Sequence, residues 1–218
     1  MRREDFSEMA ETQESHWWFK GKRRIINKLI NKRVFNETPM KILEVGSGTG
    51  ANLPVLAQYG HVTAMELDDY ARSFINEREN ISVVKGFLPD GLEAVDGKKF
   101  NLVCVFDVLE HVKEDSKALQ ALKNLLDNDG KILITVPAYQ WLYSVHDKNL
   151  GHYRRYTRKN LLELCEKNGL KILYSGYMNT FLFPLMMIAR FADNILRKIH
   201  KGGLFRLKYS GLRLELYF

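Results

Sequence analysis

Short apolar runs alternate with amphipathic stretches of helical period between residue 41 and about residue 178. Strands separated by helices usually pair in parallel, so this alternation predicts an α/β fold: a Rossmann-like, doubly wound, mostly parallel sheet with helices on both faces. The apolar runs predict strands at residues 41–45, 62–66, 81–84, 101–106, 131–136 and 171–177. The amphipathic stretches predict helices at residues 51–59, 69–78, 115–126 and 158–168. Thr157 and Gly169 are of the residue types that begin and end the last of these helices.

Helical additions are expected at the N-terminus and after the sixth predicted strand. Residues 14–34 have the pattern of an amphipathic helix, so residues 1–36 are interpreted as a helical cap on a core of residues 37–180. Residues 181–218 then carry an apolar and basic helix and a candidate final strand at 212–218. Residues 138–157 form an aromatic, histidine-rich loop after the fifth predicted strand. Ligands lie beyond the carboxyl ends of the strands in such sheets, so this loop should overhang the site.

Composition narrows the choice of compartment and partner. The 218 residues, 45% of them hydrophobic, suit one domain, and the two cysteines lack metal or redox spacing, so we expect no metal site and a cytoplasmic location. The net charge of +7 comes with no nucleic-acid-binding motif, so no nucleic acid partner is expected. The charged N-terminus predicts no secretion signal. The longest apolar run, residues 181–189, is about half of the roughly 20 residues that a bilayer span requires, and Pro184 interrupts it. Residues 181–201 could contact a membrane surface or form a dimer, which leaves a monomer or homodimer.

The segment from residue 41 to residue 50 indicates a cofactor loop. An apolar strand ends in three alternating glycines, which permit a sharp turn and a close approach of ligand to main chain. The spacing Gly46-x-Gly48-x-x-Ala51 also fits the dinucleotide pattern, so NAD and S-adenosylmethionine both remain candidates. Glu44 favours the second, because a carboxylate there can face its ammonium and sulfonium charges. Glu66, placed to accept ribose hydroxyls, suits either.

Four motifs occur in the order typical of one enzyme family: EVGSGTG at 44–50, ELD at 66–68, FDVLEHV at 106–112 and GKILITVP at 130–137. Together they resemble the class I S-adenosylmethionine-dependent methyltransferases, in the small-molecule group that includes the ubiquinone-biosynthesis type. The flanking HWWF at 16–19 and GHYRRYT at 151–157 resemble a bacterial and archaeal subgroup linked to polysaccharide, lipid or secondary-metabolite modification.

The resemblance implies a set of cofactor contacts. The methionine part would lie against Glu44 and the glycine loop, the ribose on Glu66 and the adenine beside Leu67. Many relatives have an aspartate where this chain has Phe87, so adenine would be held by stacking and backbone bonds. The implied cofactor contacts are Glu44, Gly46, Ser47, Gly48, Glu66, Leu67, Phe87, Leu88, Phe106, Asp107 and Val108.

Methyl transfer needs an aligned nucleophile, and a general base only where the acceptor keeps its proton. His111, His146 and His152 are the candidate bases, although His111 could instead brace a turn and the other two could order their loop. Arginines 154 and 155 could grip a phosphate or carboxylate, or remain solvated. The candidate acceptor contacts are Trp17, Tyr139, Asp147, Tyr153, Arg154 and Arg155.

These features predict a methyltransferase that uses S-adenosylmethionine and releases S-adenosylhomocysteine. Its acceptor is expected to be a small molecule, a glycan or a lipid-linked compound, with O-methylation favoured. Two alternatives stay open: a catalytically silent S-adenosylmethionine-binding regulatory protein and an NAD-dependent oxidoreductase. The latter would leave Glu44 and the motif at 107–111 unexplained.

Overall fold

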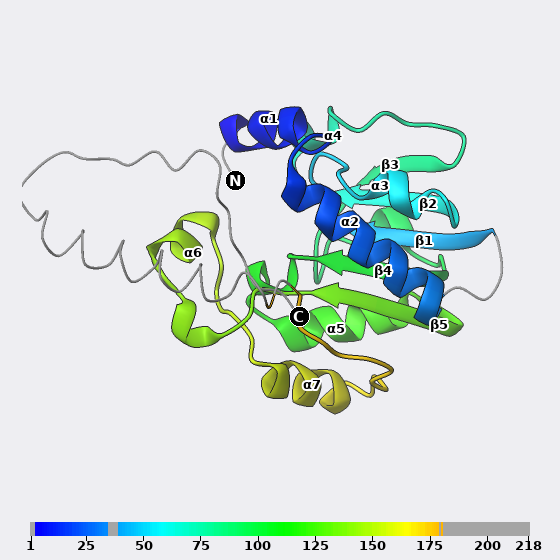
Figure 1. The fold of residues 1–218 in the computed structure, drawn as a ribbon. Coiled ribbons are helices and arrows are strands. Elements are labelled where there is room, and N and C mark those ends of the chain that lie inside the picture. The colour runs from blue at the N-terminus through cyan, green and yellow to red at the C-terminus, as the bar shows by residue number, and fades with distance from the viewer. Residues whose placement is uncertain (1–2, 35–38, 179, 181–218) are drawn as a thin grey trace, which may run out of the picture.

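The computed structural model describes residues 3–34, 39–178 and 180. Five parallel strands form one sheet in the order β3-β2-β1-β4-β5, which confirms the predicted α/β architecture (Figure 1). The strands are β1 (Met40–Val45), β2 (Gly60–Glu66), β3 (Ile81–Lys85), β4 (Phe100–Phe106) and β5 (Leu126–Thr135). The chain order reverses between β1 and β4, so the crevice outside the carboxyl ends of these strands is where such folds bind ligands.

The central strand β1 is buried on both faces, because its side chains alternate between two separate cores. Ile42 packs in the core beneath the N-terminal helices, and Leu43 and Val45 pack in the core on the opposite face. Ile42 is also in register with Val62 of β2 and Leu102 of β4. This continuous apolar burial is what a parallel strand covered on both sides requires.

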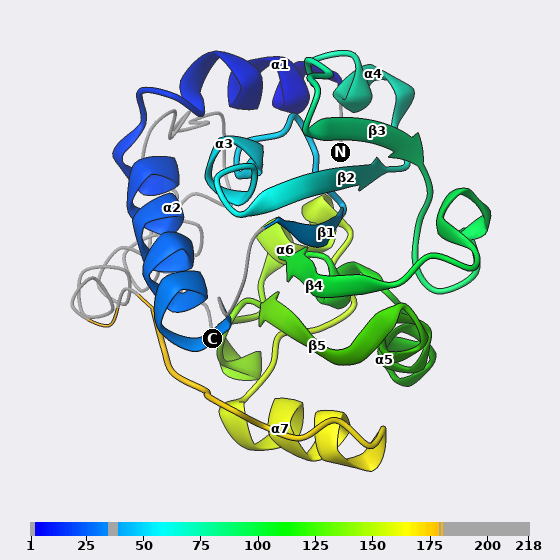
Figure 2. The same ribbon diagram turned by 90° about the vertical axis from the view of Figure 1, so that its right-hand side faces the viewer.

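Helices cover both faces of the sheet (Figure 2). α2 and α3 lie over one face and α5 over the other, while α1 contacts α4 beside the β3 edge and α7 contacts α5. α6 lies at the carboxyl ends of the strands (Figure 1). The helices are α1 (Arg3–Thr12), α2 (Trp17–Leu29), α3 (Leu53–Leu56), α4 (Asp69–Arg72), α5 (Asp115–Asn124), α6 (Val145–Leu150) and α7 (Arg158–Lys167).

The caps predicted for α7 are confirmed. The Thr157 hydroxyl accepts a hydrogen bond from the Asn160 N–H at 3.1 Å, which satisfies one free donor of the first turn. Gly169 follows the helix with a φ of +71°, a left-handed conformation that glycine adopts without strain.

The N-terminal cap differs from the single helix predicted at 14–34. α1 was not predicted, and a turn separates it from α2, whose N-cap His16 accepts a hydrogen bond from the Trp18 N–H at 3.3 Å. α2 then continues into a π-helical turn at Ile30–Val34. The predicted helices at 51–59 and 69–78 were too long, since α3 and α4 are single turns.

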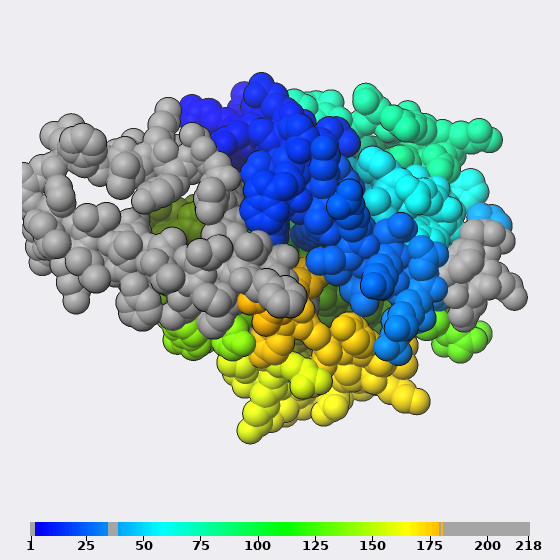
Figure 3. Space-filling view, in the orientation of Figure 1, coloured from blue at the N-terminus to red at the C-terminus, as the bar shows by residue number. Residues whose placement is uncertain are grey.

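The predicted sixth strand at 171–177 was wrong: this segment contains no strand. Within it, Arg33 lies over the Tyr174 ring at 5.2 Å and Ile172 packs against the core; the next residue, Met178, contacts Trp18 of α2 in a small apolar cluster. Figure 3 shows this orange segment beside the blue N-terminal residues. The segment therefore makes side-chain contacts with the core and with the N-terminal cap without pairing to β5.

Within the described part of the chain, no helix is long and apolar enough to cross a membrane. The predicted membrane-contacting or dimer-forming segment at 181–201 and the candidate strand at 212–218 lie outside the described residues.

Candidate cofactor and acceptor site

The glycine loop leaves the carboxyl end of β1 in a conformation that only small residues permit. Gly46 and Gly48 have φ values of +68° and +55°. A Cβ at Gly46 would lie 2.4 Å from the Cγ2 atom of Val108, so a side chain there would displace the loop that follows β4. The Ser47 hydroxyl donates back to the Glu44 carbonyl oxygen at 3.0 Å. These features shape a loop whose main chain can be approached closely by a ligand.

Glu66 ties the end of β2 to the glycine loop. One carboxylate oxygen accepts the Gly48 N–H at 2.8 Å, and the other accepts the Asp68 N–H at 3.0 Å. A carboxylate has about four acceptor positions, so two bonds leave room for the hydroxyl groups of a ligand. The carboxylate is thereby oriented before any ligand binds.

Glu44 is the most unusual acid of the site. Its side chain is 1% exposed, and although Asn52 donates to Oε1 at 2.8 Å, Oε2 has no hydrogen-bond partner among the described residues. Burial raises the pKa of Glu44 to about 7, with a further rise from Glu66, while Asn52 and Lys22 oppose the shift. A cationic group at Oε2 would offset the loss of hydration of this buried carboxylate.

Lys22 was missed by sequence reasoning and lies at the centre of the site. Its ammonium forms an ion pair with Asp107 and lies 5.5 Å from the centre of the Phe106 ring. Asp107 is further held by Thr135, whose hydroxyl donates to Oδ1 at 2.8 Å. Lys22 and Asp107 are 85 residues apart, so no local pattern could have signalled the pair.

Two exposed apolar side chains flank the site at the ends of β2 and β3. Leu67 is 50% exposed and Phe87 is 46% exposed, whereas Leu88 is buried. Exposed side chains of this kind offer flat apolar surface to a ring system such as adenine. The structure therefore leaves Leu67 and Phe87 open to a ligand and places Leu88 in the core.

The N-terminal cap contacts the glycine loop directly. Gln13 and Thr49 bond through their side chains at 2.7 Å, and the Arg23 guanidinium donates to the carbonyl oxygens of Gln13 and Ala51 at 2.7 and 3.2 Å. The join between α1 and α2 thus lies against the glycine loop.

A buried ionic network orders the loop at 138–157. Asp147 and Arg155 are 0% exposed at their side chains and pair at 2.6 Å between Oδ1 and Nε. The same Oδ1 lies 3.1 Å from Nδ1 of His152, and Ser144 donates its N–H to Oδ2 at 2.8 Å. Burial alone would raise the pKa of Asp147, but hydrogen bonds and the Arg155 charge hold it well below its ordinary value. Asp147 and His152 therefore form hydrogen bonds that order the loop, and Arg155 is buried in the same network instead of solvated.

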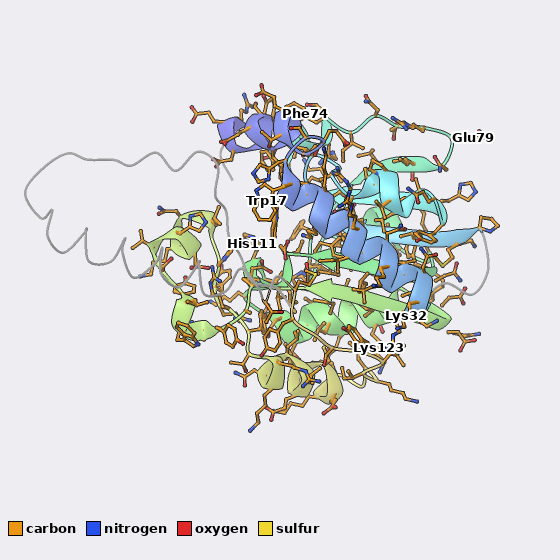
Figure 4. The ribbon with its side chains drawn as sticks, in the orientation of Figure 1. Trp17, Lys32, Phe74, Glu79, His111 and Lys123 are labelled. Carbon is orange, nitrogen blue, oxygen red and sulfur yellow. The ribbon has the colours of Figure 1, made fainter. Side chains whose placement is uncertain are left out.

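The structure brings two of the three candidate histidines together. His111 and His152 stack edge to face with ring centres 4.6 Å apart, while His146 lies on α6 outside this cluster. Both Trp17 and His111 lie at the carboxyl ends of the strands (Figure 4).

Three further acceptor candidates, Tyr139, Tyr153 and Arg154, belong to the same loop. Tyr139 stacks on Tyr177 with ring centres 5.5 Å apart, and Tyr153 is exposed. Arg154 is engaged, since it donates to the Lys113 carbonyl oxygen at 2.7 Å and pairs with Asp115.

Comparison with known proteins identifies the family. Residues 16–175 match the model of a family described as a methyltransferase domain. The ubiquinone biosynthesis O-methyltransferase of Coxiella burnetii is 20% identical over 195 residues, which covers 78% of this chain and 83% of that protein. The corresponding enzyme of Glaesserella parasuis is 28% identical over 151 residues, covering 61% of each.

Solved structures share the fold. An O-methyltransferase family protein from Burkholderia thailandensis superposes with a TM-score of 0.57 at 15% identity, covering 80% of this chain and 58% of that one. The fold, the glycine loop and the family match agree, and the chain belongs to the class I S-adenosylmethionine-dependent methyltransferases.

Proposed function

We propose that this enzyme transfers a methyl group from S-adenosylmethionine to an oxygen atom of a small-molecule, glycan or lipid-linked acceptor. The observation that carries the cofactor assignment is the buried Oε2 atom of Glu44, which has no hydrogen-bond partner among the described residues. The ammonium group of the cofactor would supply a donor and a positive charge at this atom. The preference for oxygen is supported by the O-methyltransferase relatives.

The residues of the site fit the remaining parts of the cofactor. The Glu66 carboxylate retains acceptor positions for two ribose hydroxyls, and the exposed Leu67 and Phe87 side chains suit the adenine faces. The glycine loop lets main chain approach the ligand closely. When bound, S-adenosylmethionine supplies an electrophilic methyl group on a sulfonium.

The chain itself must position the acceptor and exclude water. The loop at 138–157 borders the carboxyl ends of β4 and β5. The Tyr139 N–H donates to the Tyr156 carbonyl oxygen at 2.8 Å and joins the two ends of the loop, and the Tyr153 N–H donates to the Glu110 carbonyl oxygen beyond β4 at 2.8 Å. Exposed aromatic rings at Tyr153 and Trp141 offer contact area to an acceptor on this side. The family match removes the NAD-dependent oxidoreductase from consideration.

Calorimetric titration with S-adenosylhomocysteine tests the cofactor assignment. We expect micromolar binding by the wild-type protein, none of NADH, and loss of S-adenosylhomocysteine binding in Glu66→Ala. Glu79→Ala is the matched control, because Glu79 is exposed and projects from the far end of the sheet (Figure 4). Equal affinity in the wild type and Glu66→Ala would contradict the assignment.

An acceptor screen tests the choice of oxygen. S-adenosylmethionine with a ¹³C-labelled methyl group would be incubated with phenolic, glycan and lipid-linked compounds. The carbon chemical shift of the product distinguishes a methyl group on oxygen from one on nitrogen or carbon. Label found on nitrogen or carbon alone would contradict O-methylation while leaving the cofactor assignment in place.

A further inference from the structure

Glu110, His111 and His152 bring three metal-binding side chains to one place after the carboxyl end of β4. One ligand atom from each lies within 4.8 Å of the other two. Glu110 and His152 are buried, whereas His111 is more accessible. Two imidazoles and one carboxylate are a common ligand set for catalytic zinc and for non-haem iron, and they leave coordination positions open to a substrate. The sequence analysis expected no metal site because the two cysteines lack metal spacing, but this cluster contains no cysteine.

One main-chain hydrogen bond joins the two ligand-bearing segments, and a side-chain bond holds the main chain at His152 within its loop. The Tyr153 N–H donates to the Glu110 carbonyl oxygen at 2.8 Å, and the Tyr143 hydroxyl donates to the His152 carbonyl oxygen at 2.7 Å. Gly151 turns the chain before His152 with a φ of +79°, and a Cβ at that position would lie 3.9 Å from Nδ1 of His111. The ligand positions are therefore set by the backbone, as a preorganised site requires.

Asp147 orients the imidazole of His152 as a carboxylate orients a metal-binding histidine. Its Oδ1 atom lies 3.1 Å from Nδ1 of His152, and the carboxylate is itself held by Arg155 and by the Ser144 N–H. A carboxylate at Nδ1 places the proton there and leaves Nε2 with a free electron pair. Metal-binding histidines almost always have such a partner, which fixes both the tautomer and the ring.

Loop ordering explains the position of His152, but it does not explain why Glu110 and His111 lie beside it. The bonds among Asp147, Arg155 and His152 order the loop through Nδ1 of His152. They require neither a carboxylate at Glu110 nor an imidazole at His111. The convergence of these two side chains on His152 is the additional observation, and metal binding explains it.

We propose that Glu110, His111 and His152 bind one divalent ion of the zinc class. Tetrahedral zinc ligands lie about 2.0–2.1 Å from the ion and hence about 3.3 Å from one another. Ion binding would therefore draw the three side chains together from their present separation of up to 4.8 Å. Rotations about side-chain bonds would bring this about, with the largest adjustment at His111, the most accessible of the three.

The position of the ion suggests what it does, and this part of the inference rests on the proposed O-methylation. Glu110 is three residues beyond Asp107, which directly follows β4 at the proposed cofactor site. A hydroxyl group bound to a divalent ion releases its proton to solvent at a lower pH than a free hydroxyl does. The ion would thus orient the acceptor and provide the oxyanion that accepts a methyl group.

Zinc binding can be measured without knowing the acceptor. Protein treated with a chelator and dialysed would be titrated with Zn²⁺ in a calorimeter, for the wild type and for His111→Ala, Glu110→Gln and His61→Ala. His61 is the matched control, an exposed histidine near the amino end of β2. S-adenosylhomocysteine titrations of every variant show whether each remains folded, since the proposed cofactor contacts include none of these residues.

We expect one zinc ion per wild-type chain, unchanged affinity in His61→Ala, and affinity at least about 100-fold lower in His111→Ala and Glu110→Gln. Substitution with Co²⁺ should give visible absorption bands of a four- or five-coordinate ion, lost in His111→Ala. Equal zinc affinity in the wild type and a folded His111→Ala would overturn the site. Failure of every protein to bind S-adenosylhomocysteine would instead count against the proposed cofactor assignment.

Discussion

Lys22 of α2 and Asp107 at the end of β4 form an ion pair that connects the N-terminal cap to the sheet. The Lys22 side chain is 9% exposed and the Asp107 side chain 23% exposed, so water screens the pair only partly. Asp107 has a φ of +60°, and its N–H donates to the Thr135 carbonyl oxygen at 2.9 Å. The pair thus fixes the position of α2 over the carboxyl end of the sheet.

A double-mutant cycle should measure this connection. Lys22→Met and Asp107→Asn are each expected to lower the free energy of unfolding, because each leaves the other polar group without its charged partner. The coupling energy between them should be about 2 kcal/mol, as for a hydrogen bond between charged groups. Urea denaturation of the wild type, both single variants and the double variant gives this value. Lys20→Met, at an exposed position of the same helix, should change stability by less than about 0.5 kcal/mol.

The raised pKa of Glu44 predicts how stability depends on pH. The folded state holds the proton up to about pH 7, whereas the ordinary value is 4.5, so the free energy of unfolding falls as the pH rises between these values. The full difference corresponds to about 3 kcal/mol at pH 8. Glu44→Gln stays neutral, so its stability relative to the wild type should be higher at pH 8 than at pH 5. Urea denaturation at both pH values tests this, with the exposed Glu79→Gln as control. An equal change in the free energy of unfolding between pH 5 and pH 8 for wild type and Glu44→Gln would refute it.

Glu44 should also make the binding of S-adenosylhomocysteine depend on pH. A bound ammonium group favours the ionised form of Glu44, so binding below pH 7 must displace a proton from the carboxyl group. The affinity for S-adenosylhomocysteine should therefore fall by up to about tenfold per pH unit between pH 7 and pH 5. Calorimetry across this range provides the measurement. Glu44→Gln should bind more weakly at pH 7.5 and show a flatter profile; a profile as steep as that of the wild type would assign the proton to another group.

Asp147→Asn should be strongly destabilising. Both Asp147 and Arg155 are fully buried, so removal of the carboxylate charge leaves the Arg155 guanidinium without its counter-charge, at a cost of about 3–5 kcal/mol. The pKa of Asp147 is depressed in the folded state, so its contribution is complete above the ordinary value of 3.8 and is lost as the pH falls below it.

The wild type and Asp147→Asn should therefore become more alike in their free energy of unfolding at acid pH. Thermal denaturation at pH 7 and pH 3, in the presence of a chelator, would show the difference between wild type and Asp147→Asn narrowing on acidification. Asp129→Asn changes an exposed aspartate and serves as the control. A difference that stays constant with pH would mean that the charge of Asp147 does not carry the effect.

Much of the fold could be read from the chain because its signals are local. β1 and the glycine loop form one continuous segment, in which burial on both faces requires an apolar run and the sharp turn requires glycines at 46 and 48. The caps of α7 depend on Thr157 and Gly169, which lie within a turn of the helix they bound. Local geometry of this kind is set by residue type.

Tertiary packing decided two features that the local sequence pattern could not predict: whether residues 171–177 form a strand, and which side chains meet in the site. Residues 171–177 have the composition of a strand, and β5 is an edge strand of the sheet, yet the segment forms no strand: Tyr174 contacts Arg33 and Ile172 packs against the core. Local sequence patterns likewise did not predict which distant residues meet in the site. Glu44 and Glu66 could be proposed from their positions at strand ends, whereas the pairing of Lys22 with Asp107 and the meeting of Glu110 with His152 depend on how distant segments pack. The sequence determined β1, the caps of α7 and the glycine loop, because backbone preferences and burial act over a few residues. Only the folded structure decided which charged side chains share a site, because electrostatic and hydrogen-bond contacts depend on distance in space.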